Sequence, residues 1–235
     1  MTNESTTRTA ASAADGLVFA VGAGLVFGVT HWGVPRLAAA AGLDPFAAWM
    51  LLSVPLVFAP IIGLGWLLLR AEAPPPSWAE RLRLRRLTQR DWLWAAIGVT
   101  AILVASALLS RVSEALGLPI DPFAREPRAW APERLWMFAL WAVYLPFNIL
   151  GEEFVWRGVI LPRLEVRFAS LAWCWNAALW ACFHIGFGAG NILVVSPALL
   201  LIPLLSQWRR STWLGVVLHA GLSLPGMIAI ALGLV

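Results

Sequence analysis

The sequence predicts an all-α, polytopic transmembrane helix bundle with about seven spans, and two observations carry this prediction. Sixty per cent of the 235 residues are hydrophobic, only 13% are charged, and the mean hydropathy is +0.77. Soluble domains carry about 25% charged residues, so polar groups cannot cover the surface of this chain and lipid must cover much of it. Apolar stretches long enough to cross a bilayer core of about 30 Å also recur along the chain. A cytosolic enzyme, a secreted domain and a disordered regulator are thereby excluded.

Seven apolar stretches approach the length of about 20 residues that a transmembrane helix needs; they are 16–41, 46–69, 92–112, 134–161, 168–187, 191–208 and 212–234. We expect a polar cytoplasmic segment over 1–15, followed by one integral membrane domain over 16–235. Within this domain, 71–91 is an arginine-rich cytoplasmic loop and 134–234 carries the motifs. A cleaved signal peptide ending near residues 38–40 is the alternative for the N-terminus, but the apolar run there is long for a signal peptide.

Arginine positions predict the orientation, because positively charged loops face the cytoplasm. Counting spans from the N-terminus places twelve arginines on one side: Arg8, Arg70, Arg81, Arg83, Arg85, Arg86, Arg90, Arg157, Arg163, Arg167, Arg209 and Arg210. Five fall on the other side: Arg36, Arg111, Arg125, Arg128 and Arg134. The N-terminus is therefore expected in the cytoplasm of a multi-pass protein of a bacterial inner (cell) membrane.

The loop 71–91 is the only long segment expected on the cytoplasmic side. Pro74, Pro75 and Pro76 end the preceding helix, because proline lacks the amide hydrogen and clashes with the previous turn. Residues 81–90 alternate arginine with leucine and could lie on anionic headgroups as a short amphipathic segment. The alternative is a loop that sets topology and has no partner. The net charge of +4 comes from arginines between the apolar stretches, where they would face anionic lipids. No nucleic-acid partner is therefore expected.

The informative ionisable residues inside the predicted spans are Glu152, Glu153, Arg157, His184 and His219. A charge at the centre of a membrane costs about 2.5–3.5 kcal/mol on insertion scales, so such residues usually face a polar cavity and pair with one another. His31, in the first predicted span, has no recognisable partner and is expected to cap a helix or line the interface.

Helical spacing groups these residues into stripes. Glu153 and Arg157 are four residues apart and can pair, whereas Glu152 is rotated by about 100° from Glu153 and faces another neighbour. The other members of the stripes are the pairs Trp180–His184 and His219–Ser223, with Asn176 as a supporting residue on the face of His184. Three helices thus each offer a polar stripe, and their convergence would form one acid–base site.

Hydrolysis is the chemistry that these residue types favour. A glutamate in apolar surroundings becomes a better general base at neutral pH. One histidine could hold the same water, and a second could donate a hydrogen bond to the oxyanion formed when water attacks a carbonyl. No serine lies beside a plausible base in a strand–helix elbow.

A metal site is the alternative to this metal-free chemistry. Two histidines and a glutamate can bind zinc, but they are spread over three helices here and no HExxH pair is present. No cofactor is therefore expected, and zinc is kept as the alternative.

The motifs resemble those of the CPBP family, which comprises CAAX proteases and bacteriocin-processing (Abi) enzymes. Residues 152–158, EEFVWRG, resemble its EExxxR motif. Trp180 and His184 resemble the FxxxH motif with Trp in place of Phe, and His219 and Ser223 resemble the HxxxN motif with Ser in place of Asn. The resemblance covers about 140–230, and the first three spans add only hydrophobicity to it.

The resemblance implies an intramembrane glutamic endopeptidase with its site between the fourth, fifth and last helices. Glu152 and His184 would activate the attacking water, and Glu153 and Arg157 would pair and hold the helix.

The resemblance also assigns the oxyanion. His219 would stabilise it, and Ser223 stands where the family's asparagine assists. A hydroxyl is shorter than a carboxamide, so Ser223 would act through water or not at all.

The expected activity is cleavage of a membrane-associated peptide or protein tail, with the substrate and the lipid bilayer as the partners. Leader peptides or C-terminal sorting tails are better substrate hypotheses here than prenylated CAAX proteins. A non-catalytic bacteriocin-immunity or scaffold protein of the same fold is the alternative. A proton-coupled transporter ranks lower, because no repeated pair of broken helices supports it.

Overall fold

The computed structural model describes residues 2–120, 123 and 135–232, except for the side chains of residues 2–12 and 231. Three of the five arginines assigned to the non-cytoplasmic side, Arg125, Arg128 and Arg134, lie outside these described residues, as does the side chain of Arg8 on the other side.

Helices account for nearly all of the described chain, and no strand occurs in it. The first half contains α1 (Thr2–Gly28), η1 (Val29–Gly33), α2 (Val34–Ala41), α3 (Pro45–Ser53), η2 (Val54–Phe58), α4 (Ala59–Arg70), α5 (Trp78–Arg81) and α6 (Gln89–Ala115). The second half contains α7 (Trp136–Leu145), η4 (Pro146–Gly151), η5 (Phe154–Ile160), α8 (Leu161–Phe168), η6 (Ala169–Leu171), α9 (Ala172–Phe183), η7 (Ile185–Phe187), α10 (Ala189–Arg209) and α11 (Thr212–Leu232). The all-α prediction is confirmed.

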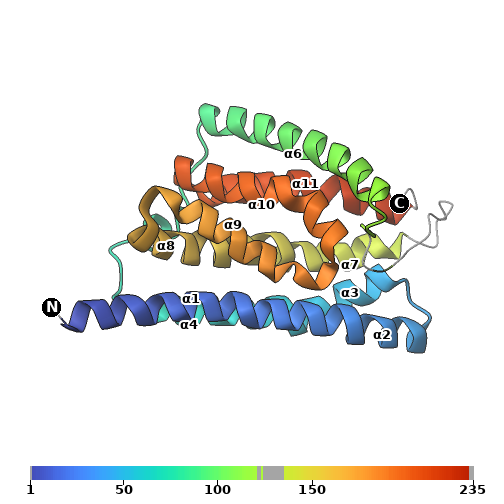
Figure 1. Cartoon of the computed structure of the whole chain (residues 1–235), viewed down its shortest axis with the longest axis horizontal. Coiled ribbons are helices and arrows are strands. Elements are labelled where there is room, and N and C mark those ends of the chain that lie inside the picture. The colour runs from blue at the N-terminus through green and yellow to red at the C-terminus, as the bar shows by residue number, and fades with distance from the viewer. Residues whose placement is uncertain (1, 121–122, 124–134, 233–235) are drawn as a thin grey trace.

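The bundle is layered, with α1 and α4 at one edge and α6 at the other (Figure 1). Helix α1 packs against α4 and α9, and α4 also packs against η5. Helix α10 packs against α6, α9 and α11. The segment from α7 to α9, which contains the EExxxR motif, therefore lies in the interior of the bundle.

Six helical segments of the described chain are long and apolar enough to cross a membrane: Ala13–Ala41, Pro45–Arg70, Gln89–Ala115, Trp136–Phe183, Ala189–Arg209 and Thr212–Ile230. The expected count of seven is approximate, because the predicted spans 134–161 and 168–187 form one 48-residue segment. This segment turns back at Ala169, whose φ of 47° and ψ of −120° interrupt the helix. Helices α8 and α9 then pack against each other.

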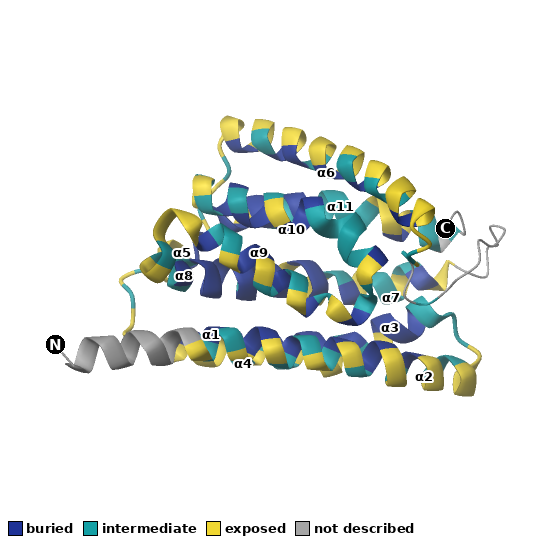
Figure 2. Cartoon of the chain, in the orientation of Figure 1, coloured by how far each residue is buried: buried dark blue, intermediate teal, exposed yellow. Residues whose placement is uncertain are grey.

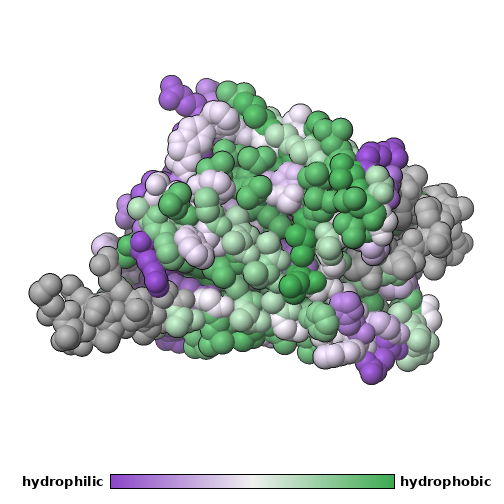
Figure 3. All heavy atoms as spheres, in the orientation of Figure 1, coloured by the Kyte–Doolittle hydropathy of each residue, from purple (hydrophilic) through white to green (hydrophobic). Residues whose placement is uncertain are grey.

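The outer helices bury one side only, as Figure 2 shows for α6. The buried residues of α6 recur at helical spacing along the side that faces α10 and α11: Asp91, Ala95, Gly98, Ile102, Ser106 and Ser113. Large apolar side chains such as Leu108 point outward. Hydrophobic residues dominate the middle of the visible surface, and hydrophilic residues lie mainly toward its ends (Figure 3). This pattern suits a bilayer around the bundle.

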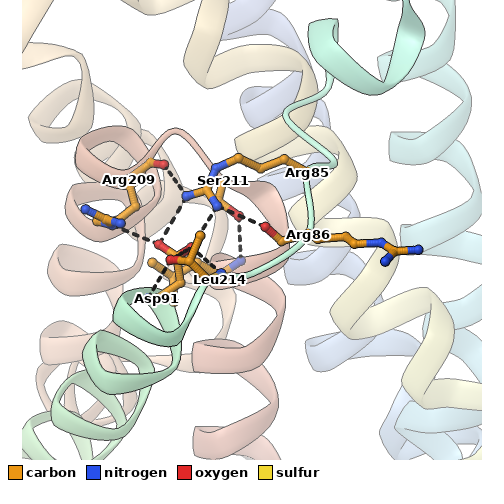
Figure 4. A network of polar contacts seen from close by, with 7 residues as sticks. Arg85, Arg86, Asp91, Arg209, Ser211 and Leu214 are labelled. Atoms are coloured by element: carbon orange, nitrogen blue, oxygen red, sulfur yellow. Dashed lines mark hydrogen bonds and ion pairs between the residues drawn. The ribbon is translucent and has the colours of Figure 1, made fainter.

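One end of the bundle carries a network of arginine contacts, which we call the arginine-rich end; it includes Arg81, Arg83, Arg85, Arg163 and Arg209. Asp91 is central to part of it (Figure 4). The Asp91 carboxylate accepts hydrogen bonds from Arg85 at 2.7 Å and from Arg209 at 2.8 Å. It also forms a capping box with Thr88 at the start of α6. These contacts tie the first turn of α6 to the end of α10.

The structure corrects the interpretation of the loop 71–91 as an amphipathic membrane-surface segment, because this segment docks on the protein; the topology-setting role of the loop stays a prediction. Leu82 and Arg83 are buried, and the Leu82 carbonyl accepts a hydrogen bond from Thr212 at 2.7 Å. Arg83 pairs with Glu165 of α8 at 2.6 Å. The segment contains only one helical turn, α5, and so forms no amphipathic helix along the membrane surface. Its arginine side chains bind the loop to η5, α8 and the end of α10.

Replacing Asp91 tests how much this network stabilises the bundle. Asp91→Asn removes the charge between two arginines and leaves their donors unmatched, so we expect the free energy of unfolding to fall by about 1–3 kcal/mol. The matched control is Glu114→Gln, which breaks the exposed Arg111–Glu114 pair of the same helix and should change little. Thermal unfolding of the purified proteins in detergent measures both. Equal effects of the two variants would contradict a structural role for Asp91.

Candidate functional site

The EExxxR motif lies on a helix with unusually wide turns. The π-helices η4 and η5 flank Glu152 and Glu153, so the two carboxylates lie where one wide segment gives way to the next. π-helical turns are rare and often occur at functional sites. Pro146, which begins η4, contributes to the irregularity because it has no amide hydrogen to donate.

The arginine-rich end supports the far side of this helix. Arg81 donates to the carbonyl oxygens of Gly158 and Val159, at 3.1 and 3.4 Å. Backbone oxygens of the irregular turns thereby gain partners that a regular helix would supply internally. The loop 71–91 thus holds the motif helix directly beyond Arg157.

Glu152 is 2% exposed and is held by three N–H donors. Asn148 Nδ2 donates to Oε1 at 2.9 Å, whereas the indole nitrogens of Trp156 and Trp180 donate to Oε2 at 3.2 and 2.9 Å. Such donors compensate for the water that a buried carboxylate loses. A carboxylate offers about four acceptor positions, so one position, on Oε1, is left.

Glu153 is completely buried and lies between two cationic or polar groups. Its Oε1 accepts from Arg157 Nη1 at 3.0 Å, which is the predicted pair, and lies 3.0 Å from His219 Nδ1. The contact with His219 joins the EExxxR helix to α11. It also means that Glu153 does more than hold its own helix, because it fixes the orientation of the His219 ring.

Trp180 of α9 lies at the centre of the site. The Arg157 guanidinium lies 3.7 Å from the centroid of the Trp180 ring, a cation–π arrangement. The rings of His184 and His219 lie 5.4 and 5.6 Å from the same indole. A single side chain therefore contacts both histidines and Arg157, and it donates to Glu152.

The His184 ring is oriented by its own helix. Its Nδ1 lies 2.9 Å from the carbonyl oxygen of Trp180. A carbonyl can only accept, so Nδ1 carries the hydrogen and donates it. In the neutral ring Nε2 is then a free acceptor.

The first span supports the site, although the sequence assigns it only hydrophobicity. Phe19 of α1 stacks on Trp156 with ring centroids 4.1 Å apart. Asn176 of α9, the predicted supporting residue, donates to the Trp156 carbonyl at 3.0 Å. Trp156 is therefore fixed from two sides, which fixes its indole N–H toward Glu152.

The second oxygen of Glu153 lies against a glycine. A Cβ atom added to Gly215 would be 2.5 Å from Glu153 Oε2 and 2.8 Å from Ser206 Oγ. Neither of these oxygens has a hydrogen-bond partner within the described part of the chain. Gly215 therefore permits the close approach of Glu153 to α11 that the contact with His219 needs.

The structure brings five of the six predicted catalytic residues together, namely Glu152, Glu153, Arg157, His184 and His219. The sixth, Ser223, is half-buried one turn beyond His219, and its side chain has no hydrogen-bond partner among the described residues. His31 is exposed, packs on Phe27 and takes no part in the site.

Sequence reasoning missed three donors to Glu152. Asn148 and Trp156 lie four residues before and after Glu152, so the same spacing that grouped Glu153 with Arg157 could have identified them. Trp180 was noted only as a departure from the phenylalanine of the motif, although the departure itself supplies an N–H that phenylalanine lacks. No sequence signal points to Ser206 or Gly215, because their role depends on how α10 and α11 approach Glu153.

Comparison with known proteins identifies the region that contains this site. Residues 134–224 match the family model described as Type II CAAX prenyl endopeptidase Rce1-like. The resemblance to CAAX proteases is confirmed over this region. The match includes all six predicted catalytic residues and supports a CAAX-type intramembrane protease with a protein substrate. No curated protein and no solved structure matches the chain.

Gly215→Ala tests the close approach within this CAAX-protease region. The added methyl group should displace the Glu153 carboxylate, lower the free energy of unfolding by about 1–3 kcal/mol through overpacking and lower any cleavage activity. Gly226→Ala is the matched control, because it lies on the same helix with nothing near its added Cβ. We expect that control to be neutral or slightly stabilising. Thermal unfolding of both variants measures the effect. A Gly215→Ala protein as stable as the wild type would contradict the close approach of Glu153 to α11.

Proposed function

We propose that the chain is an intramembrane glutamic endopeptidase that hydrolyses a peptide bond in a membrane-associated peptide or protein tail. The observation that carries the proposal is the coordination of Glu152. This buried carboxylate is fixed by three N–H donors, one of which is the indole that also contacts both histidines. A purely structural glutamate would need a cationic partner more than an unused acceptor position and a donor indole that also contacts two imidazoles.

In the proposed mechanism, one water donates its hydrogens to two acceptors. The remaining position on Glu152 Oε1 accepts one, and Nε2 of neutral His184 accepts the other. Both hydrogens are then engaged, so the lone pairs of the water oxygen are directed at the scissile carbonyl. As the oxygen attacks, its proton passes to Glu152, which later gives it to the leaving amine.

His219 supplies the proposed hydrogen-bond donor to the oxyanion. Its contact with Glu153 determines which ring nitrogen can donate. With Nδ1–H donating to an ionised Glu153, Nε2 of a neutral ring is an acceptor. Donation from Nε2 therefore requires one additional proton on the Glu153–His219 pair. Ser223, one turn further along α11, would assist through a water molecule.

The chain is a multi-pass integral membrane protein by its helices and its CAAX-protease region. We further propose that the arginine-rich end faces the cytoplasm of a bacterial cell, since that end gathers arginines from the loop 71–91, α8 and α10. Leader peptides or C-terminal sorting tails are the substrates that we propose for testing.

Glu152→Gln tests the general base. The amide has nearly the same size but cannot take the proton of water, so cleavage should fall by at least about 10²–10⁴-fold. Trp180→Phe is the comparison, because it keeps the carboxylate and removes one of its three donors; it should lower cleavage less. The assay is processing of a membrane-anchored peptide by reconstituted protein, with thermal unfolding measured in parallel. Unchanged processing by folded Glu152→Gln would rule out this mechanism and favour the immunity or scaffold alternative.

Chelation tests the proposal that the reaction needs no metal. Among the described residues, no group of three or more histidine, cysteine, aspartate or glutamate side chains is placed to hold a metal ion. We expect cleavage to persist after prolonged treatment with a strong chelator, and elemental analysis to find no stoichiometric zinc. Loss of cleavage that returns on adding zinc would instead place the enzyme among the metalloproteases.

A further inference from the structure

An open cavity of about 660 Å³ lies at the arginine-rich end, away from the Glu152 site. Its walls come from the loop 71–91, from α8 and from the turn between α10 and α11. Seven of its nine lining residues are charged: Glu72, Glu80, Arg81, Arg83, Arg163, Glu165 and Arg210. Because α4, α6, α8 and α10 all begin or end here, the cavity lies at the level where a bilayer has its headgroups.

Five of the seven charged groups form ion pairs, and Asp15, which pairs with Arg163 at 2.6 Å, completes their charge balance. Glu72 pairs with Arg81 at 2.6 Å and with Arg163 at 2.8 Å, and Arg83 pairs with Glu165 at 2.6 Å. Burial alone would raise the pKa of Glu72, but the hydrogen bonds and charges of the two arginines outweigh it and lower that pKa, so Glu72 stays ionised. These pairs form a fixed polar wall.

The remaining two charged groups, Glu80 and Arg210, have opposite signs. Both residues are exposed, and neither side chain has an ion-pair or hydrogen-bond partner among the described residues. They do not pair with each other either. The cavity therefore presents one free cation and one free anion beside a wall that is already balanced.

Arg210 occupies a backbone position that favours glycine. It follows the last residue of α10 with φ 49° and ψ 53°, the left-handed conformation that commonly ends helices and costs non-glycine residues about 1 kcal/mol or more. Arg83, which also lines the cavity, has a positive φ of 56° as well. Arginine offers no conformational advantage at either position, so what Arg210 contributes is its side chain.

We propose that this cavity binds a phosphoethanolamine headgroup of a membrane phospholipid. The phosphate would meet Arg210 and the donors of Arg83 that Glu165 does not use, because a guanidinium has five N–H groups in a planar fork. The ammonium would meet Glu80. A purely anionic headgroup would leave Glu80 without a cation, and a choline headgroup has no N–H to donate. Val166, 69% exposed at the cavity edge, offers an apolar contact for the start of an acyl chain. The site is independent of the proposed proteolysis.

Native mass spectrometry of the full-length protein with phosphatidylethanolamine, phosphatidylglycerol and phosphatidylcholine of the same acyl chains tests the proposal. We expect the wild type to bind phosphatidylethanolamine about tenfold more tightly than either other lipid, as a charge-assisted hydrogen bond allows. Arg210→Gly should bind both phosphatidylethanolamine and phosphatidylglycerol about tenfold more weakly, because the phosphate contact that the two headgroups share is lost. It should be at least as stable, because glycine suits the backbone there. Misfolding cannot then explain the loss. Arg90→Gln, which removes an exposed arginine from the same end but not from the cavity, is the matched control and should bind normally.

Glu80→Gln separates the two halves of the headgroup. It should bind phosphatidylethanolamine and phosphatidylglycerol equally, because the phosphate contact remains and the ammonium contact is lost. Inorganic phosphate at millimolar concentration should not displace the lipid; displacement would show that the ligand is free phosphate. The proposal is overturned if wild-type protein prefers phosphatidylglycerol or if Arg210→Gly binds phosphatidylethanolamine as tightly as the wild type does. It is overturned equally if Arg90→Gln loses as much binding as Arg210→Gly, since binding would then follow net charge alone.

Discussion

The burial of Glu152, Glu153 and Arg157 inside an apolar bundle is the constraint on which the rest of the structure depends. Each charge is at most 2% exposed, and the desolvation of an unpaired charge would cost several kcal/mol. Three kinds of contact offset this cost: an ion pair, an arginine over an indole, and N–H donors from two tryptophans and an asparagine. Indole suits this task in lipid surroundings, because it adds one directed donor on a large apolar body. The packing of α1, α9 and α11 around the motif helix follows from the need to place these partners.

The second polar layer, at the arginine-rich end, supports the first at a distance. Asp91 joins α6 to α10, Glu165 anchors the loop 71–91 on α8, and Arg81 reaches from that loop to the carbonyls beyond Arg157. A positively charged loop is usually explained by topology alone. Here its arginines are also structural groups that fix one end of the motif helix. The other end of that helix has no comparable clamp among the described residues.

Residue spacing within single helices predicted most of the site. The contacts that were not predicted depend on how separate helices pack against one another. Four-residue spacing gave the Glu153–Arg157 pair, and charges in apolar spans marked Glu152, His184 and His219 as residues that need partners. Hydropathy gave the helical class, but it could not show that two predicted spans are one segment folded at Ala169. The contact between Glu153 and His219 could not be predicted from the sequence either, because it depends on the close approach of α11 that Gly215 permits. The arginine–leucine pattern of 71–91 also fitted a membrane-surface segment, because the composition of a loop does not reveal the acidic residues that it will meet.

The reversal at Ala169 bears on how the site assembles. It turns the 48-residue segment into a helical hairpin, and the hydrogen bond from Trp180 to Glu152 closes over only 28 positions of chain. Contacts this local carry a small loop-closure entropy and form quickly. The Glu152 carboxylate therefore has two of its three donors within its own helix and the third in the next limb of the hairpin, so none of the three depends on α11. The partner of Glu153 on α11, His219, lies 66 positions further along the chain. Arg157 lies on the same helix as Glu153 and is the local partner that offsets the cost of burying its charge.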